Sequence, residues 1–241
     1  MSENSENGNQ PSPEAPDVRI LPRVVGSSAG LAAFALLWFW IAGRVTWIQG
    51  WALLLAFVGY VGALVWWLAR SDPDLLRERN QGAANVESWD KVVIRCYTGL
   101  LAVLLVLSAL DAGRFRWSVV PVWVQLLAWG TLCTAGTITW HVMSVNAYLS
   151  SWARIQEERG HVVVTKGLYR YVRHPMYLGI ILAFIGMPLA LGSWWALIPG
   201  LSIVGVFVYR TLREDGMLRQ KLPGYEEYTE QVRYRLLPGI W

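Results

Sequence analysis

Residues 169–179 read YRYVRHPMYLG and place three Tyr, two Arg, one His and one Pro at the start of a long apolar run. Arg210 and Glu214 follow at the far end of that run, four residues apart. Arg and His can donate hydrogen bonds to anions, a carboxylate accepts them, and Tyr adds a flat, partly apolar wall. Together these residue types could bind a ligand that carries both charges and an aromatic ring.

Each of these features also has a purely structural explanation. Tyr and Trp gather at membrane surfaces, Arg and Lys mark cytoplasmic helix ends, and Pro is favoured in the first turn of a helix. Arg210 and Glu214 have the spacing of an ordinary helical ion pair. Interpretation as a site therefore depends on the elements that bring these residues together.

Composition predicts a membrane protein. The chain has 241 residues, of which 54% are hydrophobic, 15 are Trp and only 16% are charged, against about 25% charged in soluble domains. The net charge is +4, but the basic residues are spread between apolar runs, so we expect no nucleic-acid partner. Cys96 and Cys133 lie in or beside these runs and are predicted to be small buried hydrophobes.

The uncharged runs predict an all-α, polytopic helix bundle with about six membrane crossings, because a bilayer core needs roughly 20 helical residues. The first four crossings are expected at 24–42, 47–69, 92–110 and about 119–143. The last run, 175–209, is roughly 52 Å long as a single helix. We therefore expect a turn at Gly192-Ser193 and a hairpin of two helices of about 16 residues each.

The charged segments predict the orientation and the domain limits. All Lys and Arg residues except Arg44, Arg114 and Arg116 fall on one side of this topology, so both termini should be cytoplasmic, in the inner membrane of a bacterium or archaeon. Residues 1–18 have a disordered-tail composition without a secretory signal. Residues 19–241 are expected to form one domain, with its cofactor site within 154–235.

The C-terminal tail is predicted to contain an amphipathic helix. Apolar residues recur there among charges at nearly helical spacing. Such a helix would lie against the membrane or against the loop that precedes the hairpin. The residues are Leu212, Leu218, Leu222, Tyr225 and Tyr228.

The order of these motifs resembles a known family. The string GHVVVTKGLYRYVRHPMYLG, the hairpin, and then RTLREDGML and PGYEEYTEQVRYRLLP are similar to the isoprenylcysteine carboxyl methyltransferase family and its relatives, which are integral-membrane enzymes that use S-adenosylmethionine. DPDLLRERN, SWDK and NAYLS also resemble stretches of bacterial members. The resemblance covers roughly residues 72–238.

The resemblance implies a set of site residues. Glu214 would complete the cofactor shell, Arg210 would lie near the methyl acceptor, and these two are the expected catalytic residues. Asp215 stands where the family has a second Glu. The other implied cofactor contacts are Gln156, His161, Val162, Val163, Val164, Tyr169, His174, Pro175, Met176 and Tyr177.

The chemistry of S-adenosylmethionine is consistent with these residue types. Arg173 or His174 could bind its carboxylate, Glu214 its ammonium, and the Tyr side chains its flat groups. Methyl transfer is an in-line displacement that depends on orientation and electrostatics, so no covalent nucleophile is required. The three His residues lack i,i+3 or i,i+4 spacing, and no metal site is predicted.

Two other functions fit parts of the sequence. Sterol and steroid reductases, which use NADPH, resemble it at RHPMY and at VRYRLLPGIW. A small transporter would use the polar residues only as anchors, but transporters distribute polar groups within their spans. For a methyltransferase, the acceptor stays open among carboxylates, thiols and lipid amines, carried by a lipophilic or small membrane-permeant molecule. The sequence does not indicate the oligomeric state.

Overall fold

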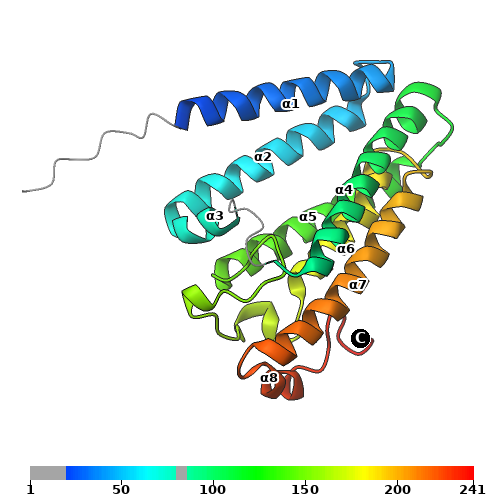
Figure 1. Cartoon of the computed structure of the whole chain (residues 1–241). Coiled ribbons are helices and arrows are strands. Elements are labelled where there is room, and N and C mark those ends of the chain that lie inside the picture. Colours follow the sequence, from blue (N-terminus) through cyan, green and yellow to red (C-terminus); the bar gives the residue numbers. More distant parts are fainter. Residues whose placement is uncertain (1–19, 80–85) are drawn as a thin grey trace, which may run out of the picture. The chain divides into compact units, whose positions relative to one another are not determined.

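The computed structural model describes residues 20–79 and 86–241. All regular structure in this part of the chain is helical, without β-strands, which confirms the all-α prediction for it. The predicted tail of residues 1–18 lies outside the described residues. The α-helices, drawn in Figure 1, are α1 (Ile20–Ala42), α2 (Ile48–Ser71), α3 (Pro73–Arg79), α4 (Ser88–Ser108), α5 (Val122–Val145), α6 (Pro175–Ala190), α7 (Leu197–Lys221) and α8 (Tyr225–Gln231).

The chain divides into two units, residues 1–37 and residues 38–241. Of the first unit, the structure describes the beginning of α1. The second unit contains the end of α1, the remaining helices, and every residue discussed below. Within it, a π-helical segment (Ala109–Phe115) continues α4, and two short 3-10 helices (Glu157–Arg159 and Gly167–Arg170) interrupt the long connection between α5 and α6.

Two helical stretches are long and apolar enough to cross a membrane, α2 and Ser88–Phe115. Both expose large apolar side chains, such as Phe57 and Trp66 on α2 and Val103 on α4, as lipid-facing helices do. Cys96 on α4 and Cys133 on α5 are exposed too, which corrects the prediction that they are buried. The other predicted crossings coincide with α1, α5, α6 and α7, and their passage through a membrane stays a prediction.

Helices α6 and α7 form the predicted hairpin. α6 has 16 residues, and the chain turns at Gly192, whose φ of +83° favours glycine. α7 is longer than predicted, with 25 residues, because the helix continues through the charged residues after Tyr209. It ends only where Leu222 precedes a Pro-Gly pair.

Close helix contacts fix this hairpin against its neighbours. α6 packs on both α5 and α7. A side chain at Gly186 would overlap with Thr131 Oγ1 on α5, and a Cβ at Gly200 would lie 2.7 Å from the carbonyl oxygen of Phe184 on α6. The absence of side chains at these two points lets the three backbones approach, so that the start of α6 and the second half of α7 are held in register.

At the turn end of the hairpin, a buried carboxylate is hydrogen-bonded to two segments of the chain. Asp111, in the π-helical segment, is fully buried. It accepts hydrogen bonds from the backbone N–H of Ser118 (2.8 Å) and from the hydroxyls of Ser118 (2.6 Å) and Ser193 (2.5 Å). The loop after α4 is thereby joined to the turn between α6 and α7.

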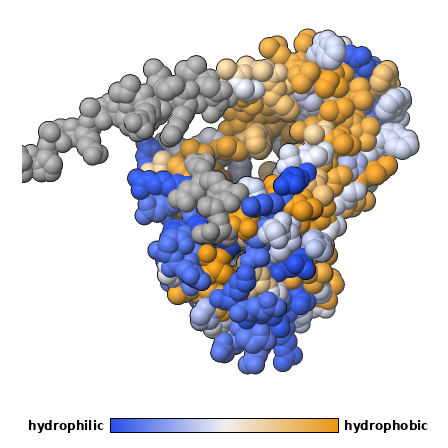
Figure 2. Space-filling view, in the orientation of Figure 1, coloured by the Kyte–Doolittle hydropathy of each residue, from blue (hydrophilic) through white to orange (hydrophobic). Residues whose placement is uncertain are grey.

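The opposite end of this unit carries the tail helix. α8 contributes Tyr225 and Tyr228 to a buried cluster with Leu222 that packs against Ile155 and Val163 of the loop before the hairpin. Leu212 and Leu218 belong to α7 and not to the tail helix as predicted, because α7 extends past them. Of the two predicted positions, the tail helix therefore adopts the one against the loop. In Figure 2 hydrophilic side chains gather at this end, and apolar ones cover the helices toward the turn.

Candidate functional site

A cavity of about 390 Å³ lies at the end of the hairpin away from its turn. The start of α6 and the second half of α7 form part of its wall, together with α4, α8, the end of α3 and the loop between α5 and α6. This one cavity brings together most of the residues singled out in the sequence. They are His161, Val162, Val163, Val164, Tyr169, Arg173, His174, Met176, Tyr177, Arg210 and Glu214.

Gln156 and Pro175 do not line the cavity. The Gln156 side chain is fully buried: it donates to the carbonyl oxygen of Tyr148 (2.6 Å) and accepts from Arg159 (2.7 Å). Pro175 is the first residue of α6, where a missing N–H has no cost. In this structure both residues shape the loop and the helix start that carry the cavity wall.

Glu214 and Tyr177 face each other across the hairpin. The Tyr177 hydroxyl donates a short hydrogen bond to Glu214 Oε2. Within the described residues, no Lys, Arg or His lies within ion-pair distance of Glu214; Arg210, already paired with Asp90, attracts it only from farther away. A carboxylate in a cavity with a neutral partner favours a cationic ligand.

The rings of His174 and Tyr177 stack at the start of α6. Their rings are parallel, with an interplanar angle of 8° and centroids 5.7 Å apart. His174 occupies the N-cap position, and its backbone N–H donates to the carbonyl oxygen of Arg235 (2.9 Å). The flat surface is thus fixed by the C-terminal segment as well as by α6.

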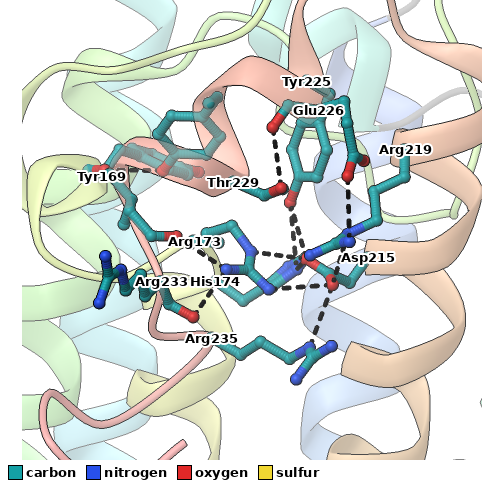
Figure 3. A network of polar contacts seen from close by, with 12 residues as sticks. Tyr169, Arg173, His174, Asp215, Arg219, Tyr225, Glu226, Thr229, Arg233 and Arg235 are labelled. Atoms are coloured by element: carbon teal, nitrogen blue, oxygen red, sulfur yellow. Dashed lines mark hydrogen bonds and ion pairs between the residues drawn. The ribbon is translucent and has the colours of Figure 1, made fainter.

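Asp215 is the centre of a buried ionic network, drawn in Figure 3. Its carboxylate accepts two hydrogen bonds from Arg173 (2.7 and 3.0 Å), one from Arg235 (3.0 Å) and one from the Tyr225 hydroxyl (3.2 Å). His174 Nε2 lies 3.4 Å from the same carboxylate. Asp215 therefore holds the start of α6, the tail helix and the C-terminal segment against α7, a role that the sequence did not reveal.

The same network occupies Arg173. Besides its two bonds to Asp215, its Nη1 donates to the carbonyl oxygens of Val232 (2.7 Å) and Arg233 (2.8 Å). Its backbone N–H donates to the carbonyl oxygen of Tyr234 (2.9 Å). Although Arg173 lines the cavity, most of its hydrogen-bonding capacity is used inside the protein, which makes it a weaker candidate for binding a ligand than its position in the motif indicates.

Arg210 enters the cavity wall from α7 and is paired with Asp90 of α4. Arg210 Nε lies 2.8 Å from Asp90 Oδ1, and Nη2 donates to Asp90 Oδ2 (3.0 Å) and to the carbonyl oxygen of Ser151 (3.1 Å). Both side chains are buried. Nη1 has no hydrogen-bond partner among the described residues, so one edge of the guanidinium is held and another remains for a ligand.

His161 forms another flat part of the wall. Its ring stacks on Tyr148, with centroids 4.7 Å apart and an interplanar angle of 23°. Burial, together with the smaller effect of the nearby positive charges of Arg159 and Arg154, lowers the pKa of His161 from 6.5 to about 4. The imidazole is therefore neutral at pH 7 and offers an uncharged face to the cavity.

Sequence reasoning missed several residues of the wall. Arg79, Tyr97, Asn146 and Tyr148 all line the cavity. Asn146 also donates to the Tyr169 hydroxyl (2.6 Å), which fixes that ring. Three of these residues lie in the stretches DPDLLRERN and NAYLS, whose resemblance to bacterial family members could have identified them. Tyr97 lies inside an apolar run, and no sequence pattern marks it. Among the described residues there is no group of three or more His, Cys, Asp or Glu that could hold a metal ion.

Comparison with known proteins agrees with this geometry. Residues 126–223 match the model of the phospholipid methyltransferase family. The match covers 98 of the 241 residues, about two fifths of the chain. The matched segment contains most of α5, both helices of the hairpin, and all of the site residues predicted from the sequence.

A curated relative supports the same assignment. The protein-S-isoprenylcysteine O-methyltransferase of Schizosaccharomyces pombe is 32% identical to the chain over 79 residues. The match covers 32% of this chain and 34% of that relative, so the chain is aligned with about a third of the relative's length. Both comparisons support the resemblance to the isoprenylcysteine carboxyl methyltransferase-like family.

Proposed function

We propose that the protein is an S-adenosylmethionine-dependent methyltransferase that acts on a lipophilic or small membrane-permeant acceptor at the cytosolic membrane face. The observation that carries the proposal is the common cavity: the segment that matches the phospholipid methyltransferase family supplies His161, four residues of the RHPMY motif, Arg210 and Glu214 to its lining. Residues separated by an entire helical hairpin converge there on a space suited to one small molecule.

The groups around the cavity fit the cofactor. Its volume, about 390 Å³, is within the range of small-molecule sites, roughly 300–1,000 Å³. Glu214 would bind a cationic group, and the aromatic faces of His161, Tyr169 and Tyr177 would enclose a flat ring and an apolar chain. When bound, S-adenosylmethionine supplies a methyl group on a positively charged sulfur, ready for in-line displacement.

The protein's part in the reaction is orientation. Arg210 is held at one edge by Asp90 and lines the cavity, and it would align an anionic or electron-rich acceptor. Tyr177 keeps the Glu214 carboxylate in place by its hydrogen bond. Fixing both reactants in this way removes much of the entropic barrier to a displacement reaction.

A second, larger cavity supports a lipophilic acceptor. It measures about 1,020 Å³ and is lined mainly by apolar side chains of α2, α5 and α6. Tyr97 and Ile180 line this cavity and the first one as well. An apolar chain in the larger cavity would therefore bring an attached polar head to the wall shared with the proposed cofactor site.

The proposal includes the membrane topology. We infer six crossings, with both termini on the cytosolic side, from the positions of α1, α2, α4, α5, α6 and α7 and from the distribution of Lys and Arg. The cavity then opens at the cytosolic face, where a soluble cofactor can reach it. Labelling single-Cys variants with a membrane-impermeant reagent tests this: Trp195→Cys, at an exposed position beside the turn, should react from outside and Gln231→Cys only from inside.

Ligand binding tests the proposed function directly. Calorimetric titration of the purified protein in detergent should detect S-adenosylmethionine and give no signal with NADPH. Membranes incubated with methyl-labelled S-adenosylmethionine should then yield labelled lipid, protein or volatile material, and the labelled fraction identifies the acceptor. Binding of NADPH alone would instead support the reductase alternative.

A further inference from the structure

Four Arg side chains line the cavity of the candidate site, and three of them are paired with buried carboxylates. Arg173 is bound by Asp215 and Arg210 by Asp90, as described above. Arg154 is bound by Glu78, with N–O distances of 3.1 and 2.7 Å. All three carboxylates are at most 4% exposed. Each of these positive charges is therefore compensated inside the protein.

Arg79, the last residue of α3, is the exception. Among the residues that the structure describes, no carboxylate lies within ion-pair distance of it. Its side chain makes one long hydrogen bond, from Nη1 to the carbonyl oxygen of Leu149 (3.4 Å). Burial lowers the pKa of Arg79, the shift expected for a cation that lacks a counter-charge.

The fold fixes the position of Arg79 at the cavity. Its carbonyl oxygen accepts a hydrogen bond from Ser151 Oγ (3.3 Å), and the carbonyl oxygen of Ser151 accepts one from Arg210 Nη2 (3.1 Å). Ser151 thus connects the end of α3 to the cavity wall near the Arg210–Asp90 pair. Arg77, two residues earlier, instead points to solvent and pairs with Asp74.

Among the described residues, two charges of the cavity wall then lack an ion-pair partner, one of each sign. Glu214 is the carboxylate, hydrogen-bonded to the neutral Tyr177, and Arg79 is the guanidinium. A partly buried charge without a partner is costly, and binding of a counter-ion removes this cost. The pattern is the one expected of a site that receives both a cationic and an anionic group.

We infer that Arg79 binds an anionic group, a carboxylate or a phosphate, of a molecule that occupies the cavity. Two sources carry this chemistry: the carboxylate of the cofactor and an acidic head group of the acceptor. This inference rests on the proposed function for the identity of these molecules. Arg79 would supply the anion contact for which Arg173, already occupied by Asp215, has little capacity left.

The test compares Arg79→Gln with Arg77→Gln, a matched control on the same helix. Inorganic phosphate should raise the thermal unfolding midpoint of the wild type and of Arg77→Gln, but not that of Arg79→Gln. Arg79→Lys, which keeps the charge, should retain part of the shift. The unfolding midpoints without phosphate show whether each variant is folded. This arm needs no cofactor and stays informative even if the wild type fails to bind S-adenosylmethionine, a result that would refute only the proposed function.

The source of the anion is identified by calorimetry and kinetics. If Arg79 binds the cofactor, the wild type prefers S-adenosylmethionine over its decarboxylated form by at least about tenfold, and Arg79→Gln loses this preference. If it binds the acceptor, cofactor affinities are unchanged and KM rises for phosphatidylethanolamine or N-acetyl-S-farnesylcysteine. The inference is overturned if Arg79→Gln matches Arg77→Gln in the phosphate shift, in cofactor affinity and in KM.

Discussion

The two ends of the α6–α7 hairpin each contain a buried aspartate, but its partners differ. At the turn end, Asp111 accepts hydrogen bonds from neutral donors, the hydroxyls of Ser118 and Ser193 and a backbone N–H. At the cavity end, Asp215 is surrounded by Arg173, Arg235 and His174. Both carboxylates join separate segments of the chain, so a buried carboxylate alone does not indicate a functional site.

What distinguishes the two ends is charge that the protein leaves without a partner. The hydrogen bonds of Asp111 are made entirely within the loop and the turn. Beside the Asp215 network, however, Glu214 and Arg79 line a cavity, and neither has an ion-pair partner among the described residues. Charged groups that find their partners inside the protein stabilise the fold, whereas charged groups without such partners in a cavity indicate a ligand.

The largest expected effect is that of Asp215→Asn. The substitution leaves Arg173 and Arg235 buried or half-buried without their counter-charge, which costs about 3–5 kcal/mol of folding free energy for a buried pair. We expect a strongly lowered unfolding midpoint and loss of S-adenosylmethionine binding, because the start of α6 and the C-terminal segment are no longer held together. Thermal unfolding in detergent and calorimetric titration measure both.

Asp111→Asn is the matched substitution at the turn end. Its donors are neutral, so no charge is stranded, and the expected cost is the mismatch of hydrogen bonds, about 1–3 kcal/mol. Cofactor affinity should stay at the wild-type value in the protein that remains folded. If Asp111→Asn weakens binding as much as Asp215→Asn does, the two ends are not functionally distinct and the comparison fails.

The next effect in size is that of Glu214→Gln, which should act on binding and not on folding. No cation is paired with Glu214 among the described residues, so neutralising it strands no charge. A hydrogen bond to a charged group contributes about 1.5–3 kcal/mol, and we therefore expect the Kd for S-adenosylmethionine to rise about tenfold to a hundredfold. Glu227→Gln, an exposed position on α8, is the control. An unchanged Kd would remove Glu214 from the cofactor site.

The sequence predicts the positions of the helices better than the partners of the charged residues. The hairpin and its break at Gly192 follow from a run too long for one crossing and from a residue that tolerates positive φ. Four of the five residues of the motif RHPMY line the same cavity as Arg210 and Glu214, and their role in a cofactor site stays a prediction. The full length of α7 did not follow, because charged residues after Tyr209 ended the apolar pattern without ending the helix.

The partners of charged residues were beyond the reach of sequence patterns. Asp90 pairs with Arg210 from 120 positions away, and Asp215 meets Arg173 from 42 positions away. Such pairs are formed by the packing of α4, α6 and α7 and leave no local spacing. For the same reason Arg173 was expected to bind a ligand, whereas Arg79, the guanidinium without a carboxylate, was not singled out.

The smallest expected effect concerns His161 and pH. Its pKa is about 4 in the folded protein against 6.5 ordinarily, so between these values the unfolded chain takes up a proton that the folded protein does not. The folded state therefore loses stability as pH falls from about 6.5 to about 4, and this loss is absent in His161→Asn. As pH is lowered through this window, the unfolding midpoint of the wild type should therefore fall more than that of the variant. A difference that is constant from pH 7.5 to 4.5 would mean that His161 titrates normally and lies open to water, which would separate it from the enclosed wall to which Tyr148 and Glu214 belong.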